Sequence, residues 1–347
     1  MRRAVPLAAF LALVALAGCG GSGSRSSTRA PRTSTTARTG TTGADGATGS
    51  TGTGATGAQP STGVRPSNPA FAPTTTTVVT DPQCRGANQR VDRDVAYSTP
   101  PAGVDPSLLS LDVYAPVRDA ECPRTHVLVS VHRGAWRDGD KRDVGQRAAL
   151  ALREGWVLVS VNHRTAPAAK YPTFDDDVAA AIAWVRTNIA RYGGDPAHIT
   201  LLGTESGAVI SAETTTDARH LARAGQPLSA IRCSVLADGQ YDIGSLGRTG
   251  SPAVLAAYGT DPRVWSDASA IGHIAPGTGM ARLLVIVRGT PAERASGTAI
   301  VNRARAGGTP ATLLATSAFS GPALDAAIGG IDETFVTPAI TEFIRSC

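Results

Sequence analysis

The chain has 347 residues, of which 33 are basic, 28 are acidic and 42% are hydrophobic. Its formal charge of +5 comes from the first 80 residues, which contain seven arginines and one acid. The other 26 basic and 27 acidic residues balance to −1, so nothing in the folded part favours nucleic-acid binding.

The N-terminus has the pattern of an export signal. Arg2 and Arg3 precede an apolar run over 4–16, which is too short to span a bilayer as a mature helix. Residues 16–19 read Leu-Ala-Gly-Cys, which resembles a bacterial lipobox. We therefore expect a signal peptide over 1–18, a lipid on Cys19 and a position on the outer face of the cell membrane, held there by that anchor. The alternative is an ordinary signal peptide that is cut nearby.

The next segment is low in complexity. Residues 20–80 are almost entirely Gly, Ser, Thr, Ala and Pro, which bury too little apolar surface to offset chain entropy. We expect a disordered tether over 19–80 with an r.m.s. span on the order of 40–47 Å. One folded domain then occupies 81–347, a plausible length for a single core.

Four cysteines remain after Cys19, and an even number in an exported chain implies two disulfides with three conceivable pairings. We favour Cys84–Cys122 and Cys233–Cys347, because each joins a terminal segment to the approach of a strand. A metal site is the alternative for these cysteines. It is disfavoured because no two of them have ligand spacing, and we expect no metal and no cofactor.

From residue 84 onward, β-branched runs alternate with helical patterns, which predicts a mostly parallel sheet covered by helices on both faces. The expected edge hairpin covers Val91–Tyr97 and Leu108–Tyr114. The buried strands are expected at His126–His132, Val157–His163, Ile199–Thr204, Cys233–Asp238, Leu283–Arg288 and Thr312–Thr316. Helices are expected at Asp143–Glu154, Asp175–Tyr192, Ser206–Arg223, Glu293–Ala306 and Glu333–Arg345.

Several motifs occur in the order seen in α/β-hydrolases. Residues 131–140 read Val-His-Arg-Gly-Ala-Trp-Arg-Asp-Gly-Asp, and residues 162–167 read Asn-His-Arg-Thr-Ala-Pro. These resemble the H-G-G-G-W and N-Y-R-L-A-P motifs of carboxylesterases related to feruloyl esterases and hormone-sensitive lipase. Residues 193–196, Gly-Gly-Asp-Pro, match the turn before the family's elbow strand. The resemblance implies an α/β-hydrolase fold of about eight strands.

The family's nucleophile motif is present with its nucleophile replaced. Residues 203–207 read Gly-Thr-Glu-Ser-Gly, where the G-x-S-x-G elbow would place a serine on a sharp strand-to-helix turn. Glu205 therefore stands in the nucleophile position. Because the tight turn needs both glycines, we expect Glu205 to adopt a positive φ. A slip of register that makes Ser206 the nucleophile would point its hydroxyl along the helix instead.

The other two triad positions are also altered. The resemblance places the acid at Ala292, one residue before Glu293, and the histidine at Gly321. Asp238 and His273 are the weak candidates for a rebuilt triad, as a displaced acid and as a histidine on a loop that could reach the site.

The oxyanion hole uses backbone N–H groups, which survive side-chain changes. The resemblance assigns it to Gly134, Ala135 and Ser206, with Arg133 where the family has glycine. We expect the carboxylate of Glu205 to occupy this hole. The alternative is that the loop persists only because the fold needs its tight turn.

Two functions follow from these observations. The first is a lipid-anchored envelope protein whose esterase-like domain has lost hydrolysis and binds a small molecule or an envelope protein, in a concave site at the carboxyl ends of the strands. A purely structural role in the envelope is not separable from it by sequence. The second is a working carboxylic-ester hydrolase with a rebuilt triad of Glu205, Asp238 or His273.

Overall fold

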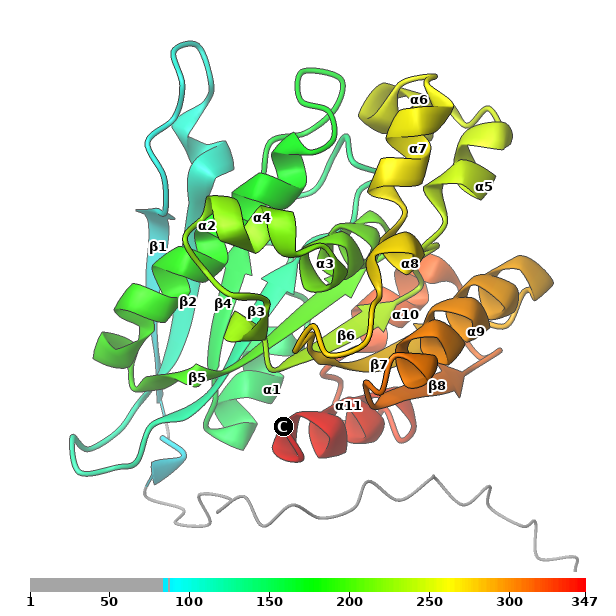
Figure 1. The fold of residues 1–347 in the computed structure, drawn as a ribbon. Coiled ribbons are helices and arrows are strands. Elements are labelled where there is room, and N and C mark those ends of the chain that lie inside the picture. The colour runs from blue at the N-terminus through cyan, green and yellow to red at the C-terminus, as the bar shows by residue number, and fades with distance from the viewer. Residues whose placement is uncertain (1–83, 87) are drawn as a thin grey trace, which may run out of the picture. The chain divides into compact units, whose positions relative to one another are not determined.

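An eight-stranded sheet runs through the domain in the order β1-β2-β4-β3-β5-β6-β7-β8 (Figure 1). The computed structural model describes residues 84–86 and 88–347, which lie within one unit, Ser67–Cys347. The expected signal peptide (1–18), the lipidated Cys19 and the tether (19–80) lie outside the described residues. None of the helices in the described part is long and apolar enough to cross a membrane.

All eight expected strands are present. β3 to β8 are parallel to one another, whereas β2 pairs antiparallel with both β1 and β4. This is the α/β-hydrolase arrangement that the motifs predict. The strands are β1 (Asn88–Ala96), β2 (Ser110–Val117), β3 (Thr125–Val131), β4 (Val157–Val161), β5 (Gly194–Thr204), β6 (Cys233–Ala237), β7 (Arg282–Val287) and β8 (Ala311–Ala315).

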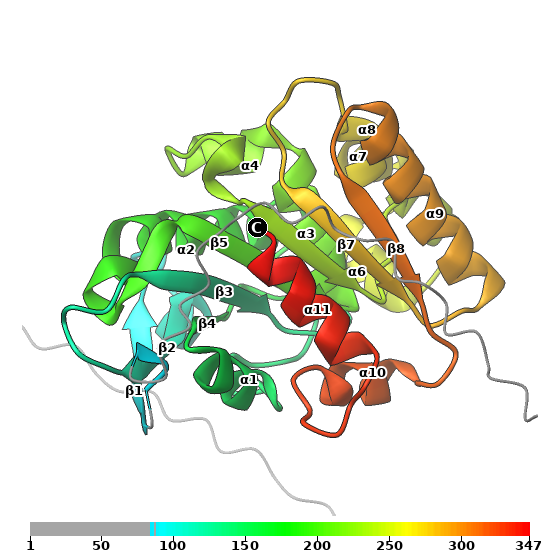
Figure 2. The ribbon, with the colours of Figure 1, turned by 90° about the horizontal axis from the view of Figure 1, so that it is seen from below.

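Helices cover both faces of this sheet (Figure 2). One face carries α2 (Thr173–Asn188), α3 (Ser206–Thr216) and α9 (Pro291–Ala306), and the other carries α1 (Arg147–Glu154), α10 (Gly321–Ala327) and α11 (Val336–Arg345). Successive strand residues point to opposite faces. Accordingly, Val127 and Val129 of β3 join the α2–α3–α9 core, and Leu128 between them joins the α1–α11 core.

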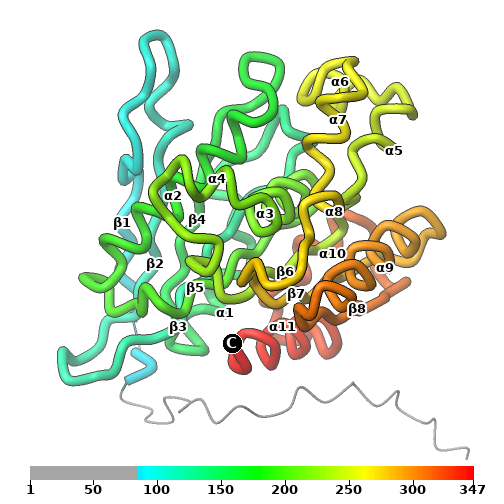
Figure 3. Tube along the Cα trace, in the orientation of Figure 1, coloured from blue at the N-terminus to red at the C-terminus, as the bar shows by residue number. Residues whose placement is uncertain are grey.

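Four short helices, which the sequence analysis did not predict, join β6 to β7. They are α5 (Ile243–Arg248), α6 (Pro252–Tyr258), α7 (Pro262–Ala268) and α8 (Ala270–His273), and Figure 3 shows their path beside the carboxyl end of the sheet. None is long enough to show a helical period, and Pro252 and Pro262 each open one of them. The sequence therefore shows where two of these helices can begin, but all four are too short to be predicted from a helical period.

The expected helix Ser206–Arg223 is two helices. Asp217 has an extended conformation (φ −95°, ψ 104°) and its side chain accepts from the Arg219 N–H, which ends α3 and begins α4 (Ala218–Arg223). An aspartate at this place competes for backbone donors and acts as an N-cap. α10 was not predicted from the sequence either. Two predicted helices differ at their start: α1 begins four residues later than expected, at Arg147, and α11 three later, at Val336.

Both expected disulfides are present. Cys84 is bonded to Cys122, and Cys233 at the start of β6 is bonded to Cys347 after α11. The second bond fixes the C-terminal helix to the centre of the sheet.

Candidate active site

The nucleophile elbow is preserved as a backbone structure. Glu205 joins β5 to α3 at φ 54° and ψ −118°, and its N–H donates to the carbonyl of Ala237. A Cβ on Gly203 would lie 2.1 Å from the carbonyl oxygen of Gly207, and one on Gly207 would lie 2.4 Å from that of His132. Only glycine fits at either position. The strained conformation at Glu205 costs about 1–3 kcal/mol, so packing around the turn must hold it.

The carboxylate of Glu205 faces the expected oxyanion loop. The backbone N–H of Gly134 donates to Oε2 of Glu205 at 3.1 Å, and Nε of Arg133 lies 3.5 Å from the same oxygen. Among the described residues, neither Ala135 nor Ser206 donates to this carboxylate. The expectation that Glu205 lies against these donors therefore holds for Gly134 alone.

The loop itself is held in an unusual conformation. Gly134, Ala135 and Trp136 have φ values of 139°, 51° and 61°, which non-glycine residues adopt rarely. A Cβ on Gly134 would lie 2.0 Å from the carbonyl oxygen of Asp138, so this position requires glycine. The carbonyl of Gly134 accepts from the N–H groups of Arg137 and Asp138, which close the turn.

Asp238, the expected displaced acid, is an ion-pair partner. It follows β6 with φ 64°, and its Oδ1 accepts from Nε of Arg288 at 2.6 Å. Arg288 also donates to Glu293. Burial raises the pKa of Asp238, the contact with Arg288 opposes that shift, and the charges of Glu293 and Glu205 add to it. The Asp238–Arg288–Glu293 triplet is thus a closed group of charges beside Glu205.

The place of the family's histidine is occupied by this triplet. A Cβ on Gly321 would lie 3.0 Å from Oδ2 of Asp238 and 3.6 Å from Cζ of Arg288. The cavity that Glu205, Asp238 and Gly321 line has no room for a water molecule. Charged side chains therefore fill this part of the expected concave site, whereas an open groove lined by residues 315–319 and 332–335 lies at the carboxyl end of β8.

Ala292 lies in the first turn of α9, where the family has its acid. Glu293 opens that helix, as expected. The hydroxyl of Thr290 accepts from the Glu293 N–H, and the Glu293 carboxylate accepts from the Thr290 N–H, which forms a capping box.

No histidine nitrogen of the described chain, which includes all six histidines, lies within 4.0 Å of the Glu205 carboxylate. His132 and His163 stack on each other with ring centroids 4.5 Å apart. Burial lowers the pKa of both rings, to about 3 for His163, so they are neutral. A general base of the usual kind is absent from this site.

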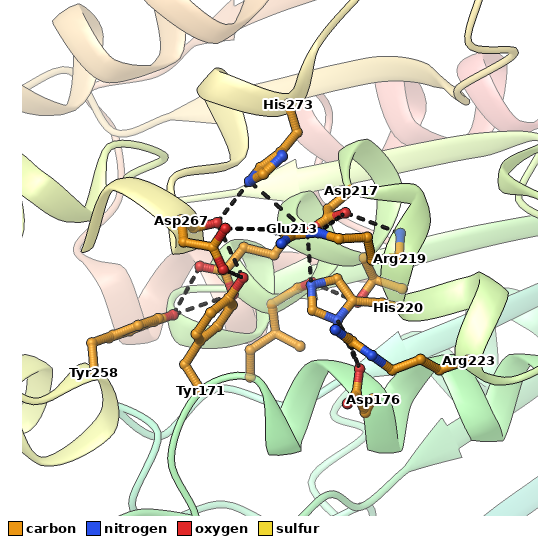
Figure 4. Close-up of polar contacts among 12 residues, drawn as sticks. Tyr171, Asp176, Glu213, Asp217, Arg219, His220, Arg223, Tyr258, Asp267 and His273 are labelled. Carbon is orange, nitrogen blue, oxygen red and sulfur yellow. Dashed lines mark hydrogen bonds and ion pairs between the residues drawn. The ribbon is translucent and has the colours of Figure 1, made fainter. Parts of the chain in front are cut away.

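His273, the other candidate for a rebuilt triad, belongs to a different cluster. Its Nε2 lies 2.6 Å from the carbonyl oxygen of Asp267 and 3.9 Å from the carboxylate of Asp217, as Figure 4 shows. The structure therefore does not bring His273 to Glu205. Nearby, Nδ1 of His220 lies 2.8 Å from Asp176. Burial lowers the pKa of His220, but this contact and the surrounding carboxylates outweigh burial and raise it.

A pair of buried acids lies beneath this cluster. Asp175 of α2 and Glu213 of α3 are both buried, and neither carboxylate oxygen of Asp175 has a hydrogen-bond partner among the described residues. Burial raises the pKa of Asp175 to about 7, and burial together with the charge of Asp175 raises that of Glu213. Tyr258 of α6 donates to Glu213 at 3.0 Å and lies edge-on to Trp136 of the oxyanion loop.

Comparison with known proteins agrees with this geometry. The BD-FAE family model matches residues 111–225, which contain the oxyanion loop and the elbow. Esterase LipQ of Mycobacterium tuberculosis is 41% identical over 103 residues, which are 29% of this chain and 24% of that protein. Carboxylesterase NlhH of the same species is 40% identical over 104 residues, 29% of this chain and 32% of that protein. Residues 111–225 therefore resemble carboxylesterases, and the fold is that of the α/β-hydrolases.

The sequence similarity is confined to about a third of this chain, whereas the similarity of fold covers about three quarters of it. It matches a quarter to a third of the length of these curated relatives. Among solved structures, a truncated carbohydrate esterase from gut microbiota has a TM-score of 0.58 at 20% identity, over 74% of this chain and 96% of that one. Esterase B from Lactobacillus rhamnosis has a TM-score of 0.59 at 15% identity, over 75% and 87%. At these identities the structures show the fold.

Sequence reasoning missed three residues that shape the α/β-hydrolase site. Arg288 fills the histidine's place, and its signal was visible as an arginine at the end of a buried strand. Asp325 of α10 accepts from the Thr204 hydroxyl at 2.7 Å and pairs with Arg147, whose side chain is buried. No local pattern marks Arg147 and Asp325, because they are 178 residues apart.

Proposed function

We propose that this chain is a lipid-anchored envelope protein whose carboxylesterase-like domain does not hydrolyse esters and binds a partner instead. The observation that carries the proposal is the contact between Glu205, in the nucleophile position, and the N–H of Gly134. A permanent anion then occupies a donor that an esterase needs for the transient oxyanion of its substrate.

The surrounding charges support the same conclusion. An acyl-transfer site needs a nucleophile, a base that takes its proton and an acid that orients the base. Here the base's place holds the Arg288–Asp238 pair, and an arginine does not take up a proton at neutral pH because it is already charged. Without a triad, the residual acceleration over water is at most roughly 10³–10⁴.

The small cavity that Glu205, Asp238 and Gly321 line has no room for a ligand, so in this proposal the partner binds another part of the surface. Two open grooves lie elsewhere on the domain. One of about 680 Å³ is lined by residues 315–319 and 332–335, and one of about 550 Å³ lies by the amino ends of β3 and β5.

A working carboxylic-ester hydrolase is the second candidate. The names of the relatives favour it, since LipQ and NlhH are called an esterase and a carboxylesterase. It requires Glu205 to act as a carboxylate nucleophile and a water to cleave the resulting ester, with Asp238 as the nearest acid that could help.

An esterase assay separates the two candidates. The purified domain, residues 67–347, is compared with its Glu205→Ala variant on p-nitrophenyl acetate and butyrate. We expect equal rates that do not saturate with substrate. Saturable turnover that disappears in Glu205→Ala would establish the hydrolase instead.

The lipid anchor has its own test. The full chain is produced in a lipoprotein-processing bacterium with a radiolabelled fatty acid, beside a Cys19→Ser variant. We expect label and membrane sedimentation for the natural chain and neither for the variant. Label that persists in Cys19→Ser would place the modification elsewhere.

A further inference from the structure

A groove lined by four arginines lies at the end of the domain opposite the elbow. Arg90, Arg118, Arg124 and Arg191 line a cavity of about 550 Å³, and Asp119 is the one acid in its lining; we call it the arginine groove. Gly193, also in the lining, precedes the first residue of β5, whereas Glu205 follows the last. Eleven residues of extended strand separate the two sites by roughly 35 Å.

Arg118 is seated by the local backbone. Its Nη2 donates to the carbonyl of Gly193, and its Nη1 is buried without a hydrogen-bond partner in the part of the chain that the structure describes. A Cβ on Gly193, which has φ 80°, would lie 2.7 Å from Nη2 of Arg118. Glycine at 193 therefore lets the guanidinium pack closely against the turn.

The other arginines of the groove supply positive charge around Arg118. Arg90 and Arg191 lie with their guanidinium carbons 5.3 and 5.2 Å from the ring centre of Tyr192. Arg90 is paired with Asp92, whose carboxylate also accepts from Tyr192. Arg191 and Arg124 are exposed and have no ion pair among residues 84–86 and 88–347, although Asp195 lies near Arg124. The unneutralised positive charge thus comes chiefly from Arg118, Arg124 and Arg191.

The N-terminal segment joins the domain at this groove. Cys122, in its lining, is bonded to Cys84, the first residue that the structure describes. The 83 residues before Cys84 therefore connect to the domain at the rim of the arginine groove. Val117, which is 55% exposed, adds an apolar side chain to the same rim.

We propose that the arginine groove binds the phosphate groups of an anionic phospholipid surface. The proposal rests on the proposed lipid anchor, which would keep the domain near the membrane. Arginine recognises phosphate through paired N–H donors. The tether expected over 19–80 would make the contact intramolecular, so a weak interaction would be sufficient to populate it.

The test uses residues 67–347, which lack Cys19 and therefore the proposed lipid anchor. Its result depends neither on that anchor nor on esterase activity. The protein is floated with vesicles of phosphatidylcholine alone or of equal parts phosphatidylcholine and phosphatidylglycerol. We expect binding to the anionic vesicles only, weakening as salt rises. Equal binding to both vesicles, or to neither, would overturn the proposal.

Two matched variants locate the contact. Arg124→Ser with Arg191→Ser removes two exposed charges from the groove, and Arg248→Ser with Arg263→Ser removes two from α5 and α7. At about fivefold for each charge, we expect the first pair to weaken binding roughly 25-fold and the second to leave it unchanged. Equal losses in both pairs would show that net charge alone is responsible, against the proposal.

A last arm separates a membrane from a soluble phosphate ligand. Inorganic phosphate and chloride are compared as competitors at equal ionic strength. Equal release by the two salts supports the membrane surface. Selective release by phosphate, lost in Arg118→Ser, would instead identify a site for a small phosphate compound.

Discussion

At the scale of single residues, the site is determined by a charged side chain in the nucleophile position, where ester hydrolysis needs a neutral group. A serine at 205 would be uncharged until it reacts, so the Gly134 N–H would remain free for the substrate. Glu205 is an acceptor already and takes that donor before any substrate arrives. Nε of Arg133 lies 3.5 Å from the same carboxylate, in an ion pair whose two side chains are both 40% exposed.

Restoring the nucleophile alone should therefore fail. We expect Glu205→Ser to show no turnover of p-nitrophenyl butyrate above Glu205→Ala, because no histidine lies within 4.0 Å to accept the hydroxyl proton. Measurable activity in that single variant would require a base that the structure does not show.

Restoring the base requires room for it. An imidazole introduced by Gly321→His would meet Arg288, but its Cβ would lie 3.0 Å from Oδ2 of Asp238, which could then serve as the orienting acid. We expect Glu205→Ser, Gly321→His and Arg288→Ala together to give detectable turnover. The same set without Arg288→Ala should be inactive, as should the set with Asp238→Asn added, and steady-state assays compare the three.

At the scale of elements, the elbow depends on the close approach of β5, α3 and the end of β3. We expect Gly207→Ala to lower the free energy of unfolding by about 3 kcal/mol or to prevent folding, because its Cβ would meet backbone oxygens of Val131 and His132 at 2.5 and 2.4 Å. Gly272→Ala is the control, since the nearest atom to its Cβ would be 4.0 Å away. Urea denaturation of both variants measures the difference.

The buried pair of Asp175 and Glu213 makes the packing of α2 against α3 depend on pH. The folded state raises both pKa values, so it keeps protons that the unfolded chain releases above about pH 4. The contribution of this pair to the free energy of unfolding is therefore greatest below about pH 4. It falls as the pH rises toward the pKa of Asp175 in the folded state, which is about 7.

Glu213→Gln tests this dependence, because an amide is uncharged and can donate a hydrogen bond to Asp175. We expect the variant to be about 1–3 kcal/mol more stable than the natural domain at pH 8, and to gain little or nothing at pH 5. Urea midpoints at the two pH values measure it. If the variant were less stable than the natural domain at pH 8, the buried pair would not lower the free energy of unfolding at that pH.

At the scale of the whole molecule, the two disulfides close loops of very different length. Their cysteines are 38 and 114 residues apart, which in the chain-entropy model corresponds to about 4 and 5 kcal/mol. We expect Cys233→Ala with Cys347→Ala to destabilise the domain more than Cys84→Ala with Cys122→Ala, by calorimetry under oxidising conditions. The reverse order would indicate that native packing, and not the unfolded chain, decides the difference.

The sequence alone determined the order of the strands along the chain, the class of fold and the changes at the three triad positions. These are local properties: each buried strand is a short β-branched run, and each motif has fixed spacing. The positive φ of Glu205 could also be predicted from the sequence, because the glycines on either side of it are needed only in a tight strand-to-helix turn.

Only the tertiary structure decided what fills the site. Arg288 and Asp238 are 50 residues apart, and Asp175 and Glu213 are 38 apart, so no local pattern can show that they meet. Likewise, the chain from Asp238 to His273 passes through four short helices that hold His273 against Asp217 and Asp267, away from Glu205. Sequence fixes which charges are present, but burial and the approach of distant strands determine which of them must pair, because an unpaired buried charge is costly.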